Sequence, residues 1–261
     1  MSEAEVLVER SGGVARIVLN RPEQGNAINH ALTERFYAAA IDVAADPSVR
    51  CVVLAGNGRM FCVGGDITEI AAGGDAIRMQ LKALAARLHD GVLVLADMAK
   101  PLVTLVNGPA AGAGYGLAIM GDIALASEVA HFTAAYTAIG LTPDGGLSWT
   151  LPRLVGMRAA QELILTNRRV AASEAVAMGL VTRTVAEDAL AEEGMALAAK
   201  LAAGPVRSFG NVRRLLQAGQ TRSLEAQLAD EAETIAASIE GEGREGVAAF
   251  LAKRKPVFTE G

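Results

Sequence analysis

The sequence has few of the residues that stabilise small secreted proteins or bind nucleic acids. Its 261 residues include two cysteines, Cys51 and Cys62, which are too few for a disulfide framework and favour a reducing, cytoplasmic location. Aromatic residues make up 4% of the chain, and 29 acidic residues outnumber 24 basic ones. Because nucleic-acid binding requires a basic face against the phosphates, we expect no nucleic-acid partner.

Long apolar runs and metal-ligand spacings are also missing from the sequence. The most apolar stretch, residues 92–120, is interrupted by Asp97, Lys100, Pro101 and several glycines, and the acidic start of the chain has no apolar signal core. We therefore expect no membrane partner and a cytoplasmic protein. His, Cys, Asp and Glu do not recur at spacings that suit a metal ion, so no metal site is expected.

Apolar residues, 51% of the chain, follow patterns that are typical of an α/β protein. Short apolar runs predict strands at residues 6–8, 14–19, 51–54, 102–106 and 122–125. Helical spacing predicts helices over 31–45 and 76–99, the second with a break near Asp90 and Gly91. Since the last part is mostly helical, we predict an α/β core over residues 1–195 and a C-terminal helical region over 196–261.

Two glycine-rich loops each follow a predicted strand, at residues 61–67 (FCVGGDI) and 110–116 (AAGAGYG). A turn of small residues before a helix leaves backbone N–H groups free where the helix dipole favours negative charge. Two such loops side by side can direct two donors at one oxygen, which makes an oxyanion hole. Taken alone, each loop is better explained as a tight turn with close helix–strand packing. The spacing G-x-G-x-G of the second loop does not fit the dinucleotide fingerprint.

Further motifs extend over nearly the whole chain: LNRP (19–22) with NAIN (26–29), FCVGGDITEI (61–70), VNGPAAGAGYGLAIMGDI (106–123), IGLTPDGGLSWTLPRLVG (139–156) and FLAKRKPVF (250–258). In this order they resemble the crotonase, or enoyl-CoA hydratase/isomerase, superfamily. The resemblance implies a spiral core of ββα units and a C-terminal helical region that packs into homotrimers, often paired into hexamers. It also implies an acyl-CoA substrate, with coenzyme A as part of the substrate and no tightly bound cofactor.

The resemblance further implies which residues contact the ligand. The backbone N–H groups of Gly65 and Ala113 are expected to hold the thioester oxygen. The adenine of CoA is expected near Ala27 and near the backbone of Asp66 and Ile67. The Asp66 side chain can equally serve as a cap of the helix that begins there.

Two basic residues are further candidates for contact with CoA. Arg59 stands where the family often has a basic residue near the nucleotide, and Lys255 can reach a phosphate from the C-terminal tail. Both residues can equally be solvated surface charges.

The two glutamates of the family's hydratases are replaced here by Gly116 and Tyr136, so ordinary two-glutamate hydration is not expected. Asp144 is the carboxylate that the resemblance places in the site. Related isomerases have an aspartate at this point, and 4-chlorobenzoyl-CoA dehalogenase uses one as a nucleophile. Thr142 and Pro143 also predict a helix start, which would put Asp144 in a first helical turn.

We therefore predict an enoyl-CoA isomerase that shifts a double bond through a thioester enolate, with Asp144 as the acid/base. One alternative is an enoyl-CoA hydratase. Another is a dehalogenase or hydrolase of an aromatic acyl-CoA, with Asp144 as nucleophile and His89 as base, although His89 can equally be a structural residue. A CoA-binding protein without catalysis is the third alternative. Residues 71–88 are expected to shape the acyl pocket, and Tyr136 either lines it or belongs to the core.

Overall fold

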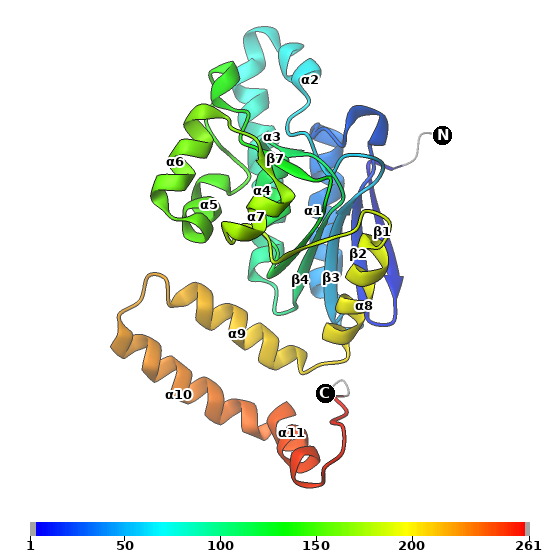
Figure 1. Ribbon diagram of the computed structural model, residues 1–261, viewed down its shortest axis with the longest axis vertical. Coiled ribbons are helices and arrows are strands. Elements are labelled where there is room, and N and C mark those ends of the chain that lie inside the picture. Colours follow the sequence, from blue (N-terminus) through cyan, green and yellow to red (C-terminus); the bar gives the residue numbers. More distant parts are fainter. Residues whose placement is uncertain (1–3, 259–261) are drawn as a thin grey trace.

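A six-stranded sheet forms the centre of the chain, which the computed structural model describes over residues 4–258, leaving the first three residues of the acidic start outside (Figure 1). Its order is β1-β2-β3-β4-β6-β9. The strands are β1 (Val6–Ser11), β2 (Val14–Leu19), β3 (Cys51–Gly56), β4 (Leu102–Val106), β6 (Ile123–Ser127) and β9 (Arg183–Val185). The β1–β2 pair is antiparallel and the other neighbours are parallel. All five strands predicted from the sequence are therefore confirmed.

The sheet is covered on both faces, as the apolar runs of its strands require. Every residue of β3 is buried. Val52 and Leu54 belong to the core cluster that includes buried residues of α1 (His30–Ala45) and α3 (Ile77–Asp97). Cys51 and Val53 belong to a separate cluster with buried residues of α8 (Leu190–Ala202). Alternate side chains of one strand thus face two different cores.

The helix α3 runs without interruption through Gly91, so the predicted break is wrong. Gly91 instead lets α3 lie close to α1. A Cβ atom at this position would lie 2.6 Å from Cδ1 of Phe36 on α1, nearer than atoms can pack. The glycine therefore marks a close helix–helix contact, and α3 can support the site along its whole length.

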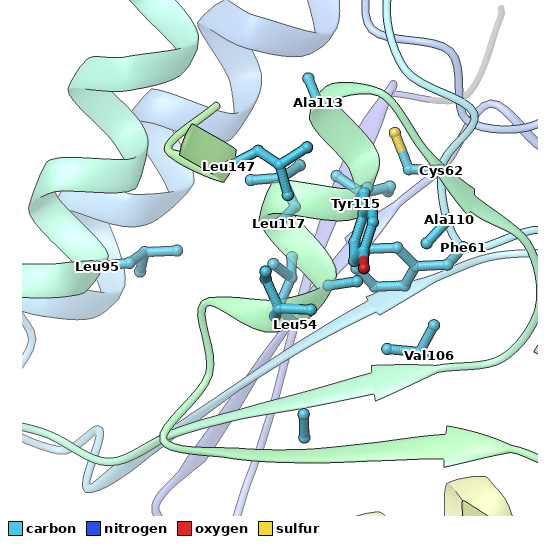
Figure 2. Packing of buried hydrophobic residues seen from close by; sticks show 14 of the residues in the cluster. Leu54, Phe61, Cys62, Leu95, Val106, Ala110, Ala113, Tyr115, Leu117 and Leu147 are labelled. Atoms are coloured by element: carbon cyan, nitrogen blue, oxygen red, sulfur yellow. The ribbon is translucent and has the colours of Figure 1, made fainter. Parts of the chain in front are cut away.

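Smaller elements follow the central strands and build the remaining walls of the molecule. A second sheet has the order β5-β7-β8, formed by Ala110–Ala111, His131–Thr133 and Val170–Ala171. The helices here are α2 (Ile67–Ala71), α4 (Ala113–Ile119), α5 (Leu147–Val155), α6 (Met157–Thr166) and α7 (Ala172–Ala177), with 3-10 turns at Pro22–Gln24, Gly74–Ala76 and Thr137–Ile139. All of α4 is buried, and Figure 2 shows its Tyr115 in one cluster with Phe61, Leu54 and Val106.

The C-terminal helices α9 (Val206–Ala218), α10 (Leu224–Glu240) and α11 (Glu242–Leu251) extend away from the sheet (Figure 1). Buried Arg213 of α9 attaches them to the core, because its guanidinium donates to the carbonyl oxygen of Leu95 at 3.0 Å and pairs with Asp122 at 2.8 Å. Residue 196, where the C-terminal helical region is predicted to begin, lies inside α8, and α8 packs on the sheet. Among residues 4–258, no helix has the length and apolar character that crossing a membrane requires.

Candidate active site

A cavity of about 540 Å³ opens where the two glycine-rich loops meet. Gly65 from the first loop, Ala113 from the second and Asp144 all line it. The wall formed by α3 is mainly apolar and consists of Leu81, Leu84, Ala85 and Leu88, together with Arg78 and Lys82. The structure therefore brings three predicted site residues together, beside the segment that was expected to shape an acyl pocket.

The two loops converge at Gly64 and Gly112, whose backbone conformations favour glycine. Gly64 and Gly112 both have left-handed φ angles, of 95° and 54°. A Cβ atom on either glycine would lie 3.4 Å from the Cα atom of the other. The loops are also joined by the N–H of Ala111, which donates to the carbonyl oxygen of Cys62 at 2.9 Å. A Cβ atom at Gly64 would also lie 3.1 Å from the carbonyl oxygen of Ala111 in the second loop, which is tighter than an ordinary contact.

The backbone N–H groups of Gly65 and Ala113 are available to a ligand. Ile28 pairs in parallel with the first loop: its N–H donates to Gly64 and its carbonyl accepts from Asp66, both at 2.8 Å. In such a pairing the intervening residue, Gly65, turns its own N–H the other way. Ala113 is the first residue of α4, where an N–H has no partner within the helix. Within residues 4–258, neither N–H has a hydrogen-bond acceptor.

Asn26 holds the chain that leads into the first loop. It is fully buried and adopts a left-handed φ of 57°, which asparagine tolerates better than most residues. Its side-chain Nδ2 donates to the carbonyl oxygens of Asn57, Met60 and Phe61 at 2.9, 2.8 and 3.1 Å, and its Oδ1 accepts from the N–H of Arg21 at 2.8 Å. We missed this role in the sequence, where the only signal was an asparagine inside a family motif.

The capping role of Asp66 is confirmed. Its carboxylate accepts from the N–H of Glu69 at 3.3 Å, in the first turn of α2, and from Nη2 of Arg21 at 3.0 Å. Partial burial is the largest single effect on Asp66 and opposes its ionisation. The hydrogen bond and charge of Arg21, together with the hydrogen bonds from the backbone N–H groups of Glu69 and Thr68, outweigh it, so the pKa of Asp66 is lowered. The backbone N–H and carbonyl of Asp66 are bonded to Ile28 and Ile70. An adenine that contacts the backbone carbonyl of Asp66, as expected, would therefore have to share this oxygen with the N–H of Ile70.

Asp144 lies in a loop before α5, and the predicted helix start at Thr142 is wrong. The helix begins at Leu147, after Gly145 and Gly146, which have left-handed φ angles of 58° and 80°. A left-handed pair cannot belong to a right-handed helical turn. Asp144 is therefore held by this loop and its neighbours and not by a helix end.

Tyr136 is the partner of Asp144. Its hydroxyl donates to Oδ1 of Asp144 at 2.6 Å, and both side chains line the cavity. Burial raises the pKa of Tyr136, and the Asp144 charge raises it further, so the phenol keeps its proton. The preceding residue, Ala135, has a φ of 63°, a strained conformation for alanine. Nothing in the local sequence pattern indicated that these two residues, eight apart, would bond.

Gly116 explains how the loop of Asp144 comes so close to α4. A Cβ atom at Gly116 would lie 2.4 Å from the carbonyl oxygen of Gly145. The backbone of the Asp144 loop thus occupies the space that a side chain at position 116 would need.

His89 supports the same loop from α3. Its Nε2 accepts the N–H of Gly145 at 3.0 Å, so this nitrogen is unprotonated and already occupied. His89 is not among the residues that line the cavity, although it lies next to it.

Of the other residues predicted to contact CoA, only some lie at the cavity. Ile67 lines the cavity. Ala27 does not line it but is buried, and its carbonyl oxygen accepts a hydrogen bond from Arg21. Arg59 is exposed in a loop outside the lining. Lys255 follows α11, a helix at the opposite end of the molecule from α2 (Figure 1), and it is not among the residues that line the cavity. Within residues 4–258, no group of three His, Cys, Asp or Glu residues is arranged to hold a metal ion.

Comparison with known proteins agrees with this geometry. Residues 9–261 match the family model "Enoyl-CoA hydratase/isomerase". A Rhodobacter capsulatus protein named "Probable enoyl-CoA hydratase" is 39% identical over 99% of both chains, and the 1,2-epoxyphenylacetyl-CoA isomerase of Escherichia coli is 35% identical over 95% of both. The crystal structure of an enoyl-CoA hydratase from Bacillus anthracis superposes with a TM-score of 0.93 at 28% identity, covering 98% of this chain and 100% of that one. The chain therefore has the crotonase fold and belongs to the enoyl-CoA hydratase/isomerase family of acyl-CoA enzymes.

Proposed function

We propose that this enzyme moves a double bond within an enoyl-CoA, by way of an enolate of the thioester. The observation that carries the proposal is the pairing of Asp144 with the Tyr136 hydroxyl at 2.6 Å, in a cavity that both line. Asp144 is the one carboxylate that lines this cavity among residues 4–258. A single carboxylate that both takes and returns a proton suits isomerisation.

The negative charge of the enolate would be held by the N–H groups of Gly65 and Ala113. Both groups border the cavity and lack an acceptor within the described residues, which is the arrangement that an oxyanion requires. Each such donor contributes about 3 kcal/mol to stabilisation of the transition state. Coenzyme A takes part as the carrier of the substrate. Contacts of Ala27 and Ile67 with its adenine, and of Arg59 with its phosphates, belong to this proposal.

One residue, Asp144, carries out both proton transfers. The Asp144 carboxylate removes a proton from the α carbon of a 3-enoyl thioester. The electron pair is delocalised onto the thioester oxygen and, through the 3,4 double bond, onto the γ carbon. Asp144 then returns the proton to the γ carbon, and the double bond moves to position 2. Tyr136 stays protonated and holds the carboxylate in place through both steps.

Hydration is the second candidate function, because relatives of this chain are named as hydratases. Gly116 and Tyr136, which replace the two glutamates of the family's hydratases, disfavour the usual two-glutamate hydration. The Gly145 carbonyl fills the space beside Gly116, and the hydroxyl of Tyr136 keeps its proton. Nucleophilic chemistry with His89 as base is disfavoured because Nε2 of His89 already accepts the Gly145 N–H.

The proposal is tested by the substitution Asp144→Asn, which keeps the shape and the acceptor for Tyr136 but removes the base. We expect the conversion of 3-enoyl-CoA to 2-enoyl-CoA, followed by the ultraviolet absorbance of the conjugated thioester, to slow by about 10²–10⁴-fold. Asp188→Asn, at an exposed position before α8, is the matched control and should behave as the parent. An Asp144→Asn enzyme with parental isomerase activity, or a parent that only hydrates 2-enoyl-CoA, would overturn the proposal.

We also propose that the C-terminal helices assemble the chain into a homotrimer, or a hexamer of two trimers. Large apolar side chains of these helices are between 69% and 82% exposed in the single chain: Leu216, Leu224, Ile235, Phe250 and Leu251. Such a concentration of exposed apolar residues is typical of an interface. Sedimentation equilibrium that finds only a monomer would contradict this assembly.

A further inference from the structure

Two positively charged side chains line the cavity. Arg78 and Lys82 lie one turn apart on α3, and both are among the lining residues. Within residues 4–258, neither makes a hydrogen bond or an ion pair with another residue. By contrast Arg87, further along the same helix, pairs with Glu34 at 2.8 Å and with Asp90 at 3.3 Å.

The stability of α3 does not explain these two cations. Like charges at positions i and i+4 of a helix are unfavourable by about 0.2–0.5 kcal/mol. Arg78 also lies in the first turn, where the helix dipole disfavours positive charge, and the first turn of α3 contains no acidic residue. A negatively charged ligand group between the two side chains would relieve both effects.

The cations lie at a defined distance from the proposed chemistry. His89 marks the level of the Asp144 loop on α3, because it bonds to Gly145. With a rise of about 1.5 Å per residue, Lys82 lies about 10 Å and Arg78 about 16 Å along the helix from this level. Between Lys82 and the level of the Asp144 loop, the cavity wall on α3 is formed by Leu84, Ala85 and Leu88. A ligand that follows this wall would meet an apolar stretch first and positive charge at its far end.

We propose that Arg78 and Lys82 select an acyl chain that ends in a carboxylate, so that the preferred substrate is a medium-chain dicarboxylic acyl-CoA. This inference rests on the proposed function, since it takes the reacting carbons to lie beside Asp144. The separation keeps the distal carboxylate away from the negative charge of Asp144. The phosphates of coenzyme A are the other source of the same anionic chemistry, and the experiment distinguishes the two.

The test uses Arg78→Gln, Lys82→Gln and the double variant in the full chain. Arg35→Gln is the matched control, because it removes one exposed charge outside the cavity. Binding of three unreactive ligands is measured by calorimetry: a saturated dicarboxylic acyl-CoA, the monocarboxylic acyl-CoA of the same length, and free CoA. We expect the parent to bind the dicarboxylic ligand about tenfold more tightly than its neutral counterpart, and the double variant to lose this preference. The preference should also shrink as salt is raised, because screening weakens exposed ion pairs.

Two results would overturn the inference. One is a parent with no preference for the dicarboxylic ligand. The other is a double variant that binds all three ligands more weakly by the same factor, which would assign the cations to the CoA phosphates. The isomerase assay on the corresponding 3-enoyl-CoA pair separates this inference from the proposed function. Isomerisation of both substrates without preference refutes only the subsite, whereas selective binding without isomerisation refutes only the reaction.

Discussion

Replacing Gly116 with alanine is expected to slow turnover although it removes no polar group. The new methyl would start 2.4 Å from the carbonyl oxygen of Gly145, whereas ordinary contact requires at least 3.4 Å. The loop that carries Asp144 would therefore have to move by about 1 Å. A displacement of this size at a reacting group lowers the rate about 10²-fold. The free energy of unfolding should fall by less than the roughly 1–3 kcal/mol that overpacking costs, because the higher helix propensity of alanine offsets part of this cost.

The assay compares kcat for the double-bond shift with the free energy of unfolding in urea. Gly246→Ala in α11 is the matched control, because a Cβ atom there meets nothing within 4 Å. It should keep the parental kcat and gain up to about 1 kcal/mol of stability. A Gly116→Ala enzyme with parental kcat would refute the reasoning that the backbone contact positions Asp144.

Two further predictions concern buried groups. Tyr136→Phe removes a hydrogen bond to a charged carboxylate, and such a bond is worth about 1.5–3 kcal/mol. In steady-state kinetics, kcat should therefore fall about 10–100-fold with little change in KM. An unchanged kcat would contradict the role given to Tyr136. Burial raises the pKa of both Cys51 and Cys62 from 9.0 to about 12. The unfolded chain therefore loses these protons first, and the free energy of unfolding should fall between pH 9 and 12 by about 1.4 kcal/mol per pH unit for each thiol. Urea titrations should show a shallower fall for a variant with alanine at both positions, and equal slopes would contradict the assignment.

The parts of the fold that follow local patterns could be predicted from the sequence. Apolar runs located the strands, and two glycine-rich stretches located the loops that meet at the cavity. Predictions failed where a local pattern has two tertiary outcomes. Gly91 is compatible with a helix break or with a close helix contact, and only the position of Phe36 decides between them. Thr142 and Pro143 fit a helix start, but the left-handed pair that follows leads the chain elsewhere.

The candidate site was predictable in its residues more than in its interactions. Gly65, Ala113 and Asp144 follow from the motifs and line one cavity. The bond from Tyr136 and the acceptor role of His89 could not be predicted, because each depends on where separate segments meet in space. Lys255 was placed near CoA by resemblance, and it is not among the residues that line the cavity.

The single asparagine beneath the first loop has a consequence for chemical ageing. Deamidation of Asn26 would exchange one nitrogen for one oxygen and change almost nothing in shape. The three carbonyl oxygens that now receive hydrogen bonds from Nδ2 would instead face a carboxylate oxygen. Three hydrogen bonds would be replaced by three repulsive contacts between buried oxygens. A modification that is harmless at most exposed positions would therefore destabilise the segment that leads into the Gly65 loop.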